Sequence, residues 1–142
     1  MNKHQFEHEQ ISANIIGAAI EVHKALGAGY TEIVYANALS VALAGRGVRY
    51  LREHEVNLYS NEVHVGTHRL DLLVEEVIVV ELKAVERIDE LHLAQVRSYL
   101  KSTRKRVGLL LNFNAPVLGV KRVVHTPQEF FSVDLRVAEL PR

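Results

Sequence analysis

The sequence predicts a mixed α/β fold, in which a central sheet of parallel and antiparallel strands is flanked by helices. Three segments carry apolar residues at helical spacing, and the segments between them alternate apolar and polar residues. A helical segment separates two strongly apolar runs, 77–83 and 107–111, which favours a right-handed crossover between parallel strands. The 142 residues, 48% of them hydrophobic, suffice for one domain. We expect its core at about 12–125 and a tail at 126–142.

The three helical segments are bounded by ordinary start and stop signals. They span about residues 12–26, 31–44 and 89–103. Ser, Thr and Asp side chains accept a hydrogen bond from a free amide of the first turn, so they are favoured N-caps. The N-caps expected here are Ser12, Thr31 and Asp89.

The strands follow from alternation with a period of two residues. One strand is expected around 56–58 and a second around 63–65, joined by a turn at 60–61. The second strand either continues past Gly66 or restarts to carry Asp71. A last short strand is expected at 120–125, after the apolar strand at 107–111.

Charged residues interrupt the apolar run at 77–83. Glu81 and Lys83 share one face of that strand, because residues i and i+2 point to the same side. The short connection at 75–76 would fold this run against the preceding one, so that Asp71 meets Glu81 with Lys83 beside them. Charged groups at such a place are costly unless they are paired or bind a metal. The spacing therefore fits either a structural ion pair of Lys83 with one carboxylate or a metal-dependent phosphodiester hydrolase.

The chemistry of these three side chains suits the second interpretation. Asp71 and Glu81 would supply hard oxygen ligands for Mg²⁺ or Mn²⁺. A bound cation would offset their repulsion, polarise a phosphate and lower the pKa of a bound water. Lys83 could stabilise the developing negative charge or position the attacking water.

Three other residues are weaker candidates on spacing alone. Glu32 lies in the first turn of the second helical segment, where the helix dipole favours a carboxylate even without a function. Gln95 and Tyr99 are on one face of the third segment and could reach Lys83 or a substrate phosphate. Residues at such positions are more often ordinary boundary residues.

Composition excludes several other classes of protein. The 17 basic and 17 acidic side chains cancel, which argues against a protein that mainly coats nucleic acid. The lack of cysteine excludes disulfides and thiolate metal sites. The histidines show no zinc spacing, and we interpret His64 and His68 as surface or hairpin residues. No apolar run approaches the roughly 20 residues that span a bilayer. Residues 1–8 lack the apolar core of a signal peptide, so we expect a cytoplasmic protein.

Taken together, these residues resemble the PD-(D/E)XK nuclease superfamily and, more closely, its GxxExxY family of small proteins. The naming motif reads GYTEIVY at 29–35, and the nuclease core reads as Asp71 followed by ELK at 81–83. Residues 95–99, QVRSY, match the QxxxY element of the RecB-like branch of the superfamily. The strand at 107–113 resembles the one that follows that helix in the family.

This resemblance implies a restriction-endonuclease-like fold, an Mg²⁺ or Mn²⁺ cofactor and a nucleic-acid substrate, most readily DNA. The metal ligands that it implies are Glu32, Asp71 and Glu81. The catalytic residues that it implies are Asp71, Glu81, Lys83, Gln95 and Tyr99.

Three functions are compatible with these features. The main hypothesis is a metal-dependent nuclease that acts on DNA. The second is a catalytically silent module on the same fold, which would bind nucleic acid or serve in an assembly without cleaving. The third is a structural protein that forms a homodimer through the apolar tail. The apolar residues of that tail are Phe130, Phe131, Val133, Leu135 and Val137.

Overall fold

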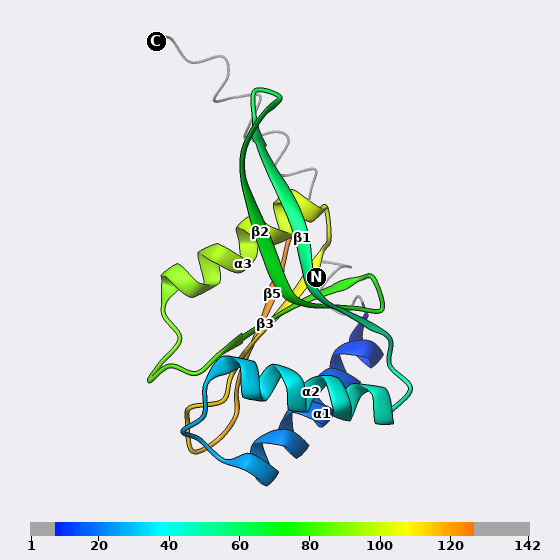
Figure 1. Ribbon diagram of the computed structural model, residues 1–142, viewed down its shortest axis with the longest axis vertical. Helices are drawn as coiled ribbons and strands as arrows, with labels where there is room; N and C mark the ends of the chain where they lie inside the picture. The colour runs from blue at the N-terminus through cyan, green and yellow to red at the C-terminus, as the bar shows by residue number, and fades with distance from the viewer. Residues whose placement is uncertain (1–7, 127–142) are drawn as a thin grey trace.

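The structure is a computed structural model that describes residues 8–126, and within that range the chain forms three α-helices and five strands (Figure 1). The helices are α1 (Glu9–Leu26), α2 (Glu32–Gly45) and α3 (Glu90–Thr103). The strands are β1 (Tyr50–Ser60), β2 (Val63–Val74), β3 (Ile78–Lys83), β4 (Val107–Asn112) and β5 (Gly119–Val124). This is the order that the sequence predicts. The apolar tail residues lie outside the described range.

The strands form one mixed sheet in the order β1-β2-β3-β4-β5. Strands β3 and β4 are parallel, with Ile78 opposite Val107 and Lys83 opposite Asn112, and α3 makes the crossover between them. The other neighbouring pairs are antiparallel. The predicted mixture of an antiparallel hairpin and a parallel crossover is confirmed.

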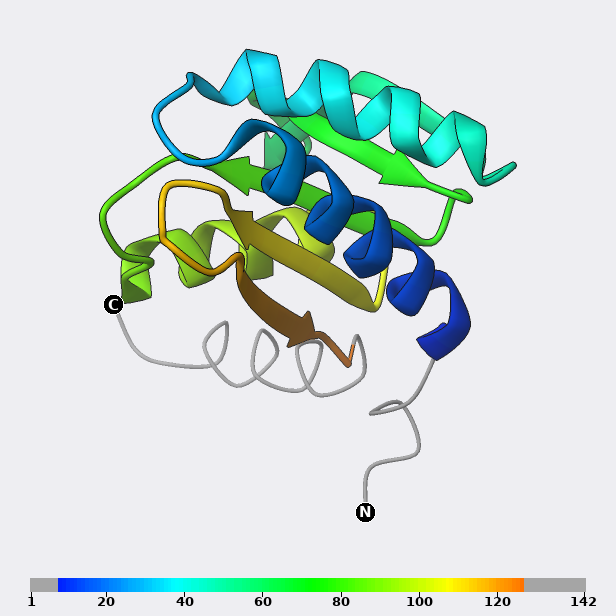
Figure 2. The same cartoon turned by 90° about the horizontal axis from the view of Figure 1, so that it is seen from below.

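Helices cover both faces of the sheet, so the fold has three layers (Figure 2). Helices α1 and α2 pack on one face, and α3 packs on the other. The apolar residues of β3 and β4 alternate between the two cores: Val80 and Leu109 face α1 and α2, whereas Val79 and Leu110 face α3. Burial on both faces explains why β3 and β4 read as continuous apolar runs.

The helix starts agree with the sequence at two of three places. Asp89 caps α3, because its Oδ1 accepts a hydrogen bond from His92 N at 3.1 Å and His92 Nδ1 accepts one from Asp89 N at 3.0 Å. Thr31 is the N-cap of α2, although its side chain makes no capping bond. Ser12 was predicted wrongly as the cap of α1. It is buried inside that helix, where its Oγ accepts a hydrogen bond from Arg122 at 2.7 Å.

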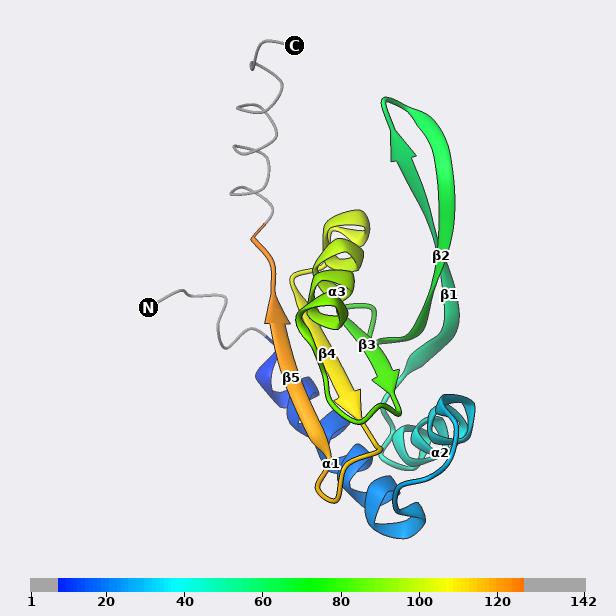
Figure 3. The same ribbon diagram turned by 90° about the vertical axis from the view of Figure 1, so that its left-hand side faces the viewer.

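Helix α3 lies unusually close to β4 because Gly108 leaves room for it. A Cβ at this position would lie 2.7 Å from Val96 Cγ1, nearer than two carbon atoms can approach. This close contact brings α3 alongside β3 (Figure 3). The positions of Gln95 and Tyr99 relative to β3 follow from it.

The β1–β2 hairpin continues far beyond the rest of the sheet (Figure 1, Figure 3). Strand β2 runs without a break through Gly66, which settles the two alternatives that the sequence left. Asn61 and Glu62 form the two-residue turn, and both have the positive φ that favours the tight turns of hairpins. Near the tip, the side chains of Val63 and Val65 are exposed.

No helix within residues 8–126 is long and apolar enough to cross a membrane.

Candidate active site

The acidic pair predicted from the sequence lies where β2 and β3 separate. The two strands pair only from Leu72 opposite Val80 to the turn that joins them. At the next pair of residues, Asp71 and Glu81, hydrogen bonds to side chains replace the backbone hydrogen bonds between the strands. Leu82 N donates to Asp71 Oδ2 at 2.8 Å, and Asp71 N donates to Glu81 Oε1 at 3.3 Å. The predicted meeting of Asp71 and Glu81 across this hairpin is therefore present in the structure.

A break in the pleat of β2 places Asp71 in this fork. In a regular strand, residues three apart face opposite sides. Leu70 and Leu73 nevertheless both pack in the α3 core, while Leu72 packs in the other core. On β1, Glu53 stands opposite this point and has a φ of 50°, which an extended strand does not adopt. The hairpin therefore bends at Asp71, and its carboxylate reaches the backbone of β3.

Glu81 is the most perturbed acid of the site. Its residue is 4% exposed, on the α3 side of a central strand. Burial, reinforced by the neighbouring Asp71 carboxylate, raises the pKa of Glu81 to about 9. Two acids held this close without a compensating cation form a site that gains from binding one.

Lys83 lies beside the acids but is not paired with them. Its Nζ donates to Gln95 Oε1 at 3.3 Å, and within the described part of the chain it forms no ion pair with Asp71 or Glu81. The alternative of a structural ion pair is thus wrong. Because Gln95 is neutral, it directs the ammonium group without neutralising its charge.

A hollow of about 410 Å³ opens next to this lysine. It lies between β3 and the first turns of α3. The lining residues are Lys83, Leu91, His92, Ala94, Gln95 and Ser98. A substrate that entered it would meet the Lys83 ammonium.

Tyr99 is the second α3 residue at the site. It is buried, and burial followed by the charges of Glu81 and Asp71 raises its pKa above the usual value. Its ring stacks on His68, with ring centroids 3.5 Å apart and an interplanar angle of 16°. The structure therefore brings Gln95 to Lys83 and Tyr99 to His68 from one helix, and the catalytic roles of the two residues stay predictions.

Glu32 approaches from the other side of the sheet. It shares a hollow of about 220 Å³ with Asp71, next to the first turns of α2. The remaining lining residues are Ile33, Ala36, Arg52 and Glu53. Over residues 8–126, no three carboxylate or imidazole groups already converge as a closed metal site. Glu32 as a third metal ligand thus stays a prediction.

The tyrosine of the GxxExxY motif has a structural role. The Tyr35 hydroxyl donates to Gly27 O at 2.5 Å and accepts from Tyr30 N at 3.2 Å, which closes the connection between α1 and α2. Its ring stacks on Phe113 at a centroid distance of 4.6 Å. Tyr35 therefore anchors the start of α2, where Glu32 sits.

Asn112 holds the segment that follows Lys83. Its buried side chain accepts a hydrogen bond from Val85 N at 3.1 Å and donates one to Val85 O at 2.9 Å. This pair of bonds ties the end of β4 to the exit of β3. Asn112 is therefore a supporting residue of the site that the spacing of motifs did not reveal.

His68 is the site residue that the sequence interpretation missed. It lies in the β1–β2 hairpin as expected, yet its Nε2 is 3.9 Å from Glu81 Oε1. Burial lowers the pKa of His68, the Asp71 charge raises it and the Lys83 charge lowers it. Nothing in the sequence marks the break in the pleat that turns His68 toward β3.

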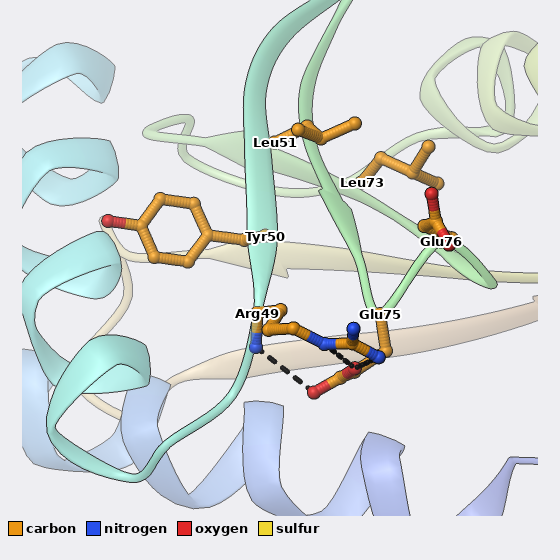
Figure 4. A pocket seen from close by; sticks show the side chains of 6 residues that line it. All are labelled: Arg49, Tyr50, Leu51, Leu73, Glu75 and Glu76. Atoms are coloured by element: carbon orange, nitrogen blue, oxygen red, sulfur yellow. Dashed lines mark hydrogen bonds and ion pairs between the residues drawn. The ribbon is translucent and has the colours of Figure 1, made fainter.

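A separate hollow of about 180 Å³ lies at the turn between β2 and β3 (Figure 4). Here Glu75 accepts hydrogen bonds from Arg49 N at 3.0 Å and from Arg49 Nε at 3.0 Å. Glu75 N donates in return to Arg49 O at 2.9 Å. These bonds lower the pKa of Glu75, and the two residues satisfy each other's charge. This hollow holds a structural ion pair, separate from the acidic fork.

The comparison with protein families agrees with this geometry. The sequence model of the PD-(D/E)XK nuclease superfamily matches residues 9–123, so this chain belongs to that superfamily. The curated proteins include no match to the chain.

Two solved structures resemble this one. The first, described as the crystal structure of SSO0001, has a TM-score of 0.51 and 18% identity, and the match covers 91% of this chain and 65% of that one. The second is an alkaline exonuclease (LHK-Exo) from Laribacter hongkongensis, with a TM-score of 0.53, 10% identity and coverage of 97% and 79%. At these identities the likenesses show the fold alone. They confirm the predicted restriction-endonuclease-like α/β fold.

Proposed function

We propose that this protein is a nuclease that hydrolyses phosphodiester bonds in DNA with Mg²⁺ or Mn²⁺, and that it belongs to the GxxExxY branch of its superfamily. The observation that carries the proposal is the fork between β2 and β3. There Asp71 and the buried Glu81 lie together, and the adjacent Lys83 is paired with neither.

The donors present fit a small divalent cation. Carboxylate oxygens are the ligands that Mg²⁺ and Mn²⁺ prefer. Burial, followed by the Asp71 charge, raises the pKa of Glu81, and a bound cation would offset both effects. Asp71 and Glu81 would hold the ion, with Glu32 as a third acid from α2. Such an ion polarises a phosphate and lowers the pKa of a bound water.

The remaining residues of the site act without the ion. The Lys83 ammonium, directed by Gln95, would stabilise the negative charge that develops on the phosphate. The rings of Tyr99 and His68 stack on each other beside Glu81. Contacts from α3 and both strands would hold these side chains in place for the positioning of a phosphodiester.

The substrate and setting are part of the same proposal. Membership of a nuclease superfamily and the exonuclease among the similar structures support nucleic acid as the substrate. Zero net charge leaves little general attraction for the phosphate backbone, so we expect modest binding of DNA at a local site. We expect the protein to act in the cytoplasm.

The direct test is cleavage of labelled single- and double-stranded DNA with Mn²⁺, Mg²⁺ or EDTA. Asp71→Asn removes one charge and keeps the shape, so we expect metal-dependent cleavage to fall by about 100-fold or more. Glu75→Gln is the matched control, because it changes an acid of the same hairpin outside the fork.

Equal cleavage by the wild type and Asp71→Asn would contradict the site. DNA binding without any cleavage by the wild type would favour the catalytically silent module instead. Circular dichroism of both variants shows whether the fold is kept.

A further inference from the structure

His68 presents a ring nitrogen to the acidic fork that the proposed function leaves unused. Nε2 is shielded from solvent and has no hydrogen-bond partner. A buried polar atom normally finds a partner, and one without any needs an explanation. The nearest acid is Glu81, whose Oε1 lies 3.9 Å away, beyond hydrogen-bond distance.

The ring is held in this orientation by its neighbours. It stacks on Tyr99 with centroids 3.5 Å apart, and its side chain is 26% exposed. Strand β2 fixes the backbone of His68, and α3 fixes Tyr99. The nitrogen is therefore directed at the fork before any ligand arrives.

The separation between the two atoms suits a shared ion. Ligand atoms that each lie roughly 2.0–2.2 Å from one cation are themselves roughly 3–4 Å apart. The distance of 3.9 Å between His68 Nε2 and Glu81 Oε1 falls in that interval. A direct hydrogen bond would have drawn the two atoms about 1 Å closer.

We propose that His68 Nε2 is a nitrogen ligand of the divalent cation held by Asp71 and Glu81, and that it favours Mn²⁺ over Mg²⁺ at this site. This inference rests on the proposed metal dependence of the nuclease. Imidazole is a ligand of transition metals, whereas Mg²⁺ takes oxygen ligands and keeps its waters. A single nitrogen among carboxylates therefore shifts the preference toward Mn²⁺.

The test measures metal binding directly on the intact chain. Isothermal titration with MnCl₂ and MgCl₂ gives the two affinities, and electron spin echo modulation of bound Mn²⁺ detects a directly coordinated nitrogen. His68→Phe keeps an aromatic ring against Tyr99 and removes the nitrogen. His64→Phe is the matched control on β2, because His64 is exposed and bonds Thr67 at 3.1 Å.

We expect a nitrogen modulation in the wild type and in His64→Phe that disappears in His68→Phe. We expect His68→Phe to lose about tenfold in Mn²⁺ affinity, with little change for Mg²⁺. Mn²⁺ bound without nitrogen modulation, or unchanged Mn²⁺ affinity in His68→Phe, would overturn the role of His68 and leave the nuclease intact. A wild type that binds neither ion would overturn the inference together with the metal dependence on which it rests.

Discussion

Glu75 and Glu81 lie on either side of the start of β3, and the structure treats them in opposite ways. The Glu75 carboxylate accepts hydrogen bonds from the backbone amide and the guanidinium of Arg49, and these bonds lower the pKa of Glu75. Glu81 is buried beside another acid, and its pKa is raised to about 9. The first acid is satisfied by the folded chain, and the second is not.

The difference separates an acid that the fold neutralises from one that we propose as a metal ligand. The turn that holds Glu75 is closed by its own ion pair (Figure 4). In the fork, Lys83 stands beside the acids and bonds Gln95 instead. A perturbed acid beside a lysine and two hollows is a candidate functional site. The variants below alter one region at a time.

The largest effect is expected for Lys83→Met. Removing the ammonium takes away the charge that stabilises the phosphate, so cleavage should fall by about 100- to 1,000-fold while the fold is kept. Arg49→Met is the matched control, because that cation pairs with Glu75 in the turn, outside the fork. A single-turnover cleavage assay with Mn²⁺ measures both. Equal losses in the two variants would show that the fork has no special role.

A smaller loss is expected for Gln95→Leu. Lys83 then keeps its charge but loses the 3.3 Å hydrogen bond that directs it, so cleavage should fall by about tenfold. Ser98→Ala, on the wall of the same hollow, should cleave at the wild-type rate. Cleavage by Gln95→Leu at the wild-type rate would contradict a catalytic role for Gln95.

Stability should respond to pH in opposite directions in the two regions. Folding raises the pKa of Glu81 from 4.5 to about 9, so the folded state binds the proton more tightly across this interval. The free energy of unfolding in EDTA therefore falls as pH rises through it. Glu81→Gln removes this penalty and should be more stable than the wild type at pH 8, by about 1–3 kcal/mol. Urea unfolding at pH 6 and pH 8 measures it, and a less stable variant at pH 8 contradicts the burial of an uncompensated acid.

The smallest effect is expected for Glu75→Gln. The folded pKa of Glu75 is lowered, so its stabilising contribution is present above the unfolded pKa of 4.5 and is lost as pH falls through the folded value. At pH 8 the variant should unfold at a slightly lower temperature than the wild type. A higher melting temperature would mean that the Arg49 pair does not stabilise the turn.

Much of the fold could be predicted because its segments carry strong periods. The helices near Ile15 and Val96 each bury an apolar face, and the helix near Leu39 is rich in apolar residues. The strands β3 and β4 begin as apolar runs, before Glu81 and Asn112. Ser12 misled because a serine at a helix start and one buried one turn inside it look the same in sequence. Strand β1 starts earlier than the sequence predicts. Polar residues such as Arg52 and Glu55 stand where an apolar alternation would have marked the strand, because this hairpin is largely exposed.

The centre of the site could also be predicted, but its surroundings could not. The short turn at Glu75 fixes the register, so Asp71 and Glu81 meet. The roles of His68 and Asn112 depend on a strand bend and on a contact between distant segments. A single sequence carries no signal for either. Whether the chain belongs to the GxxExxY branch stays a prediction.

The most direct test of the central claim is a titration of Mn²⁺ against the melting temperature at pH 8. The acids of the fork, not the acid of the turn, should bind the ion. At free Mn²⁺ of about 100 times the dissociation constant, binding stabilises the folded protein by about 2.7 kcal/mol. We predict a rise in melting temperature for the wild type and Glu75→Gln that Glu81→Gln lacks. Equal rises in all three proteins would contradict the account.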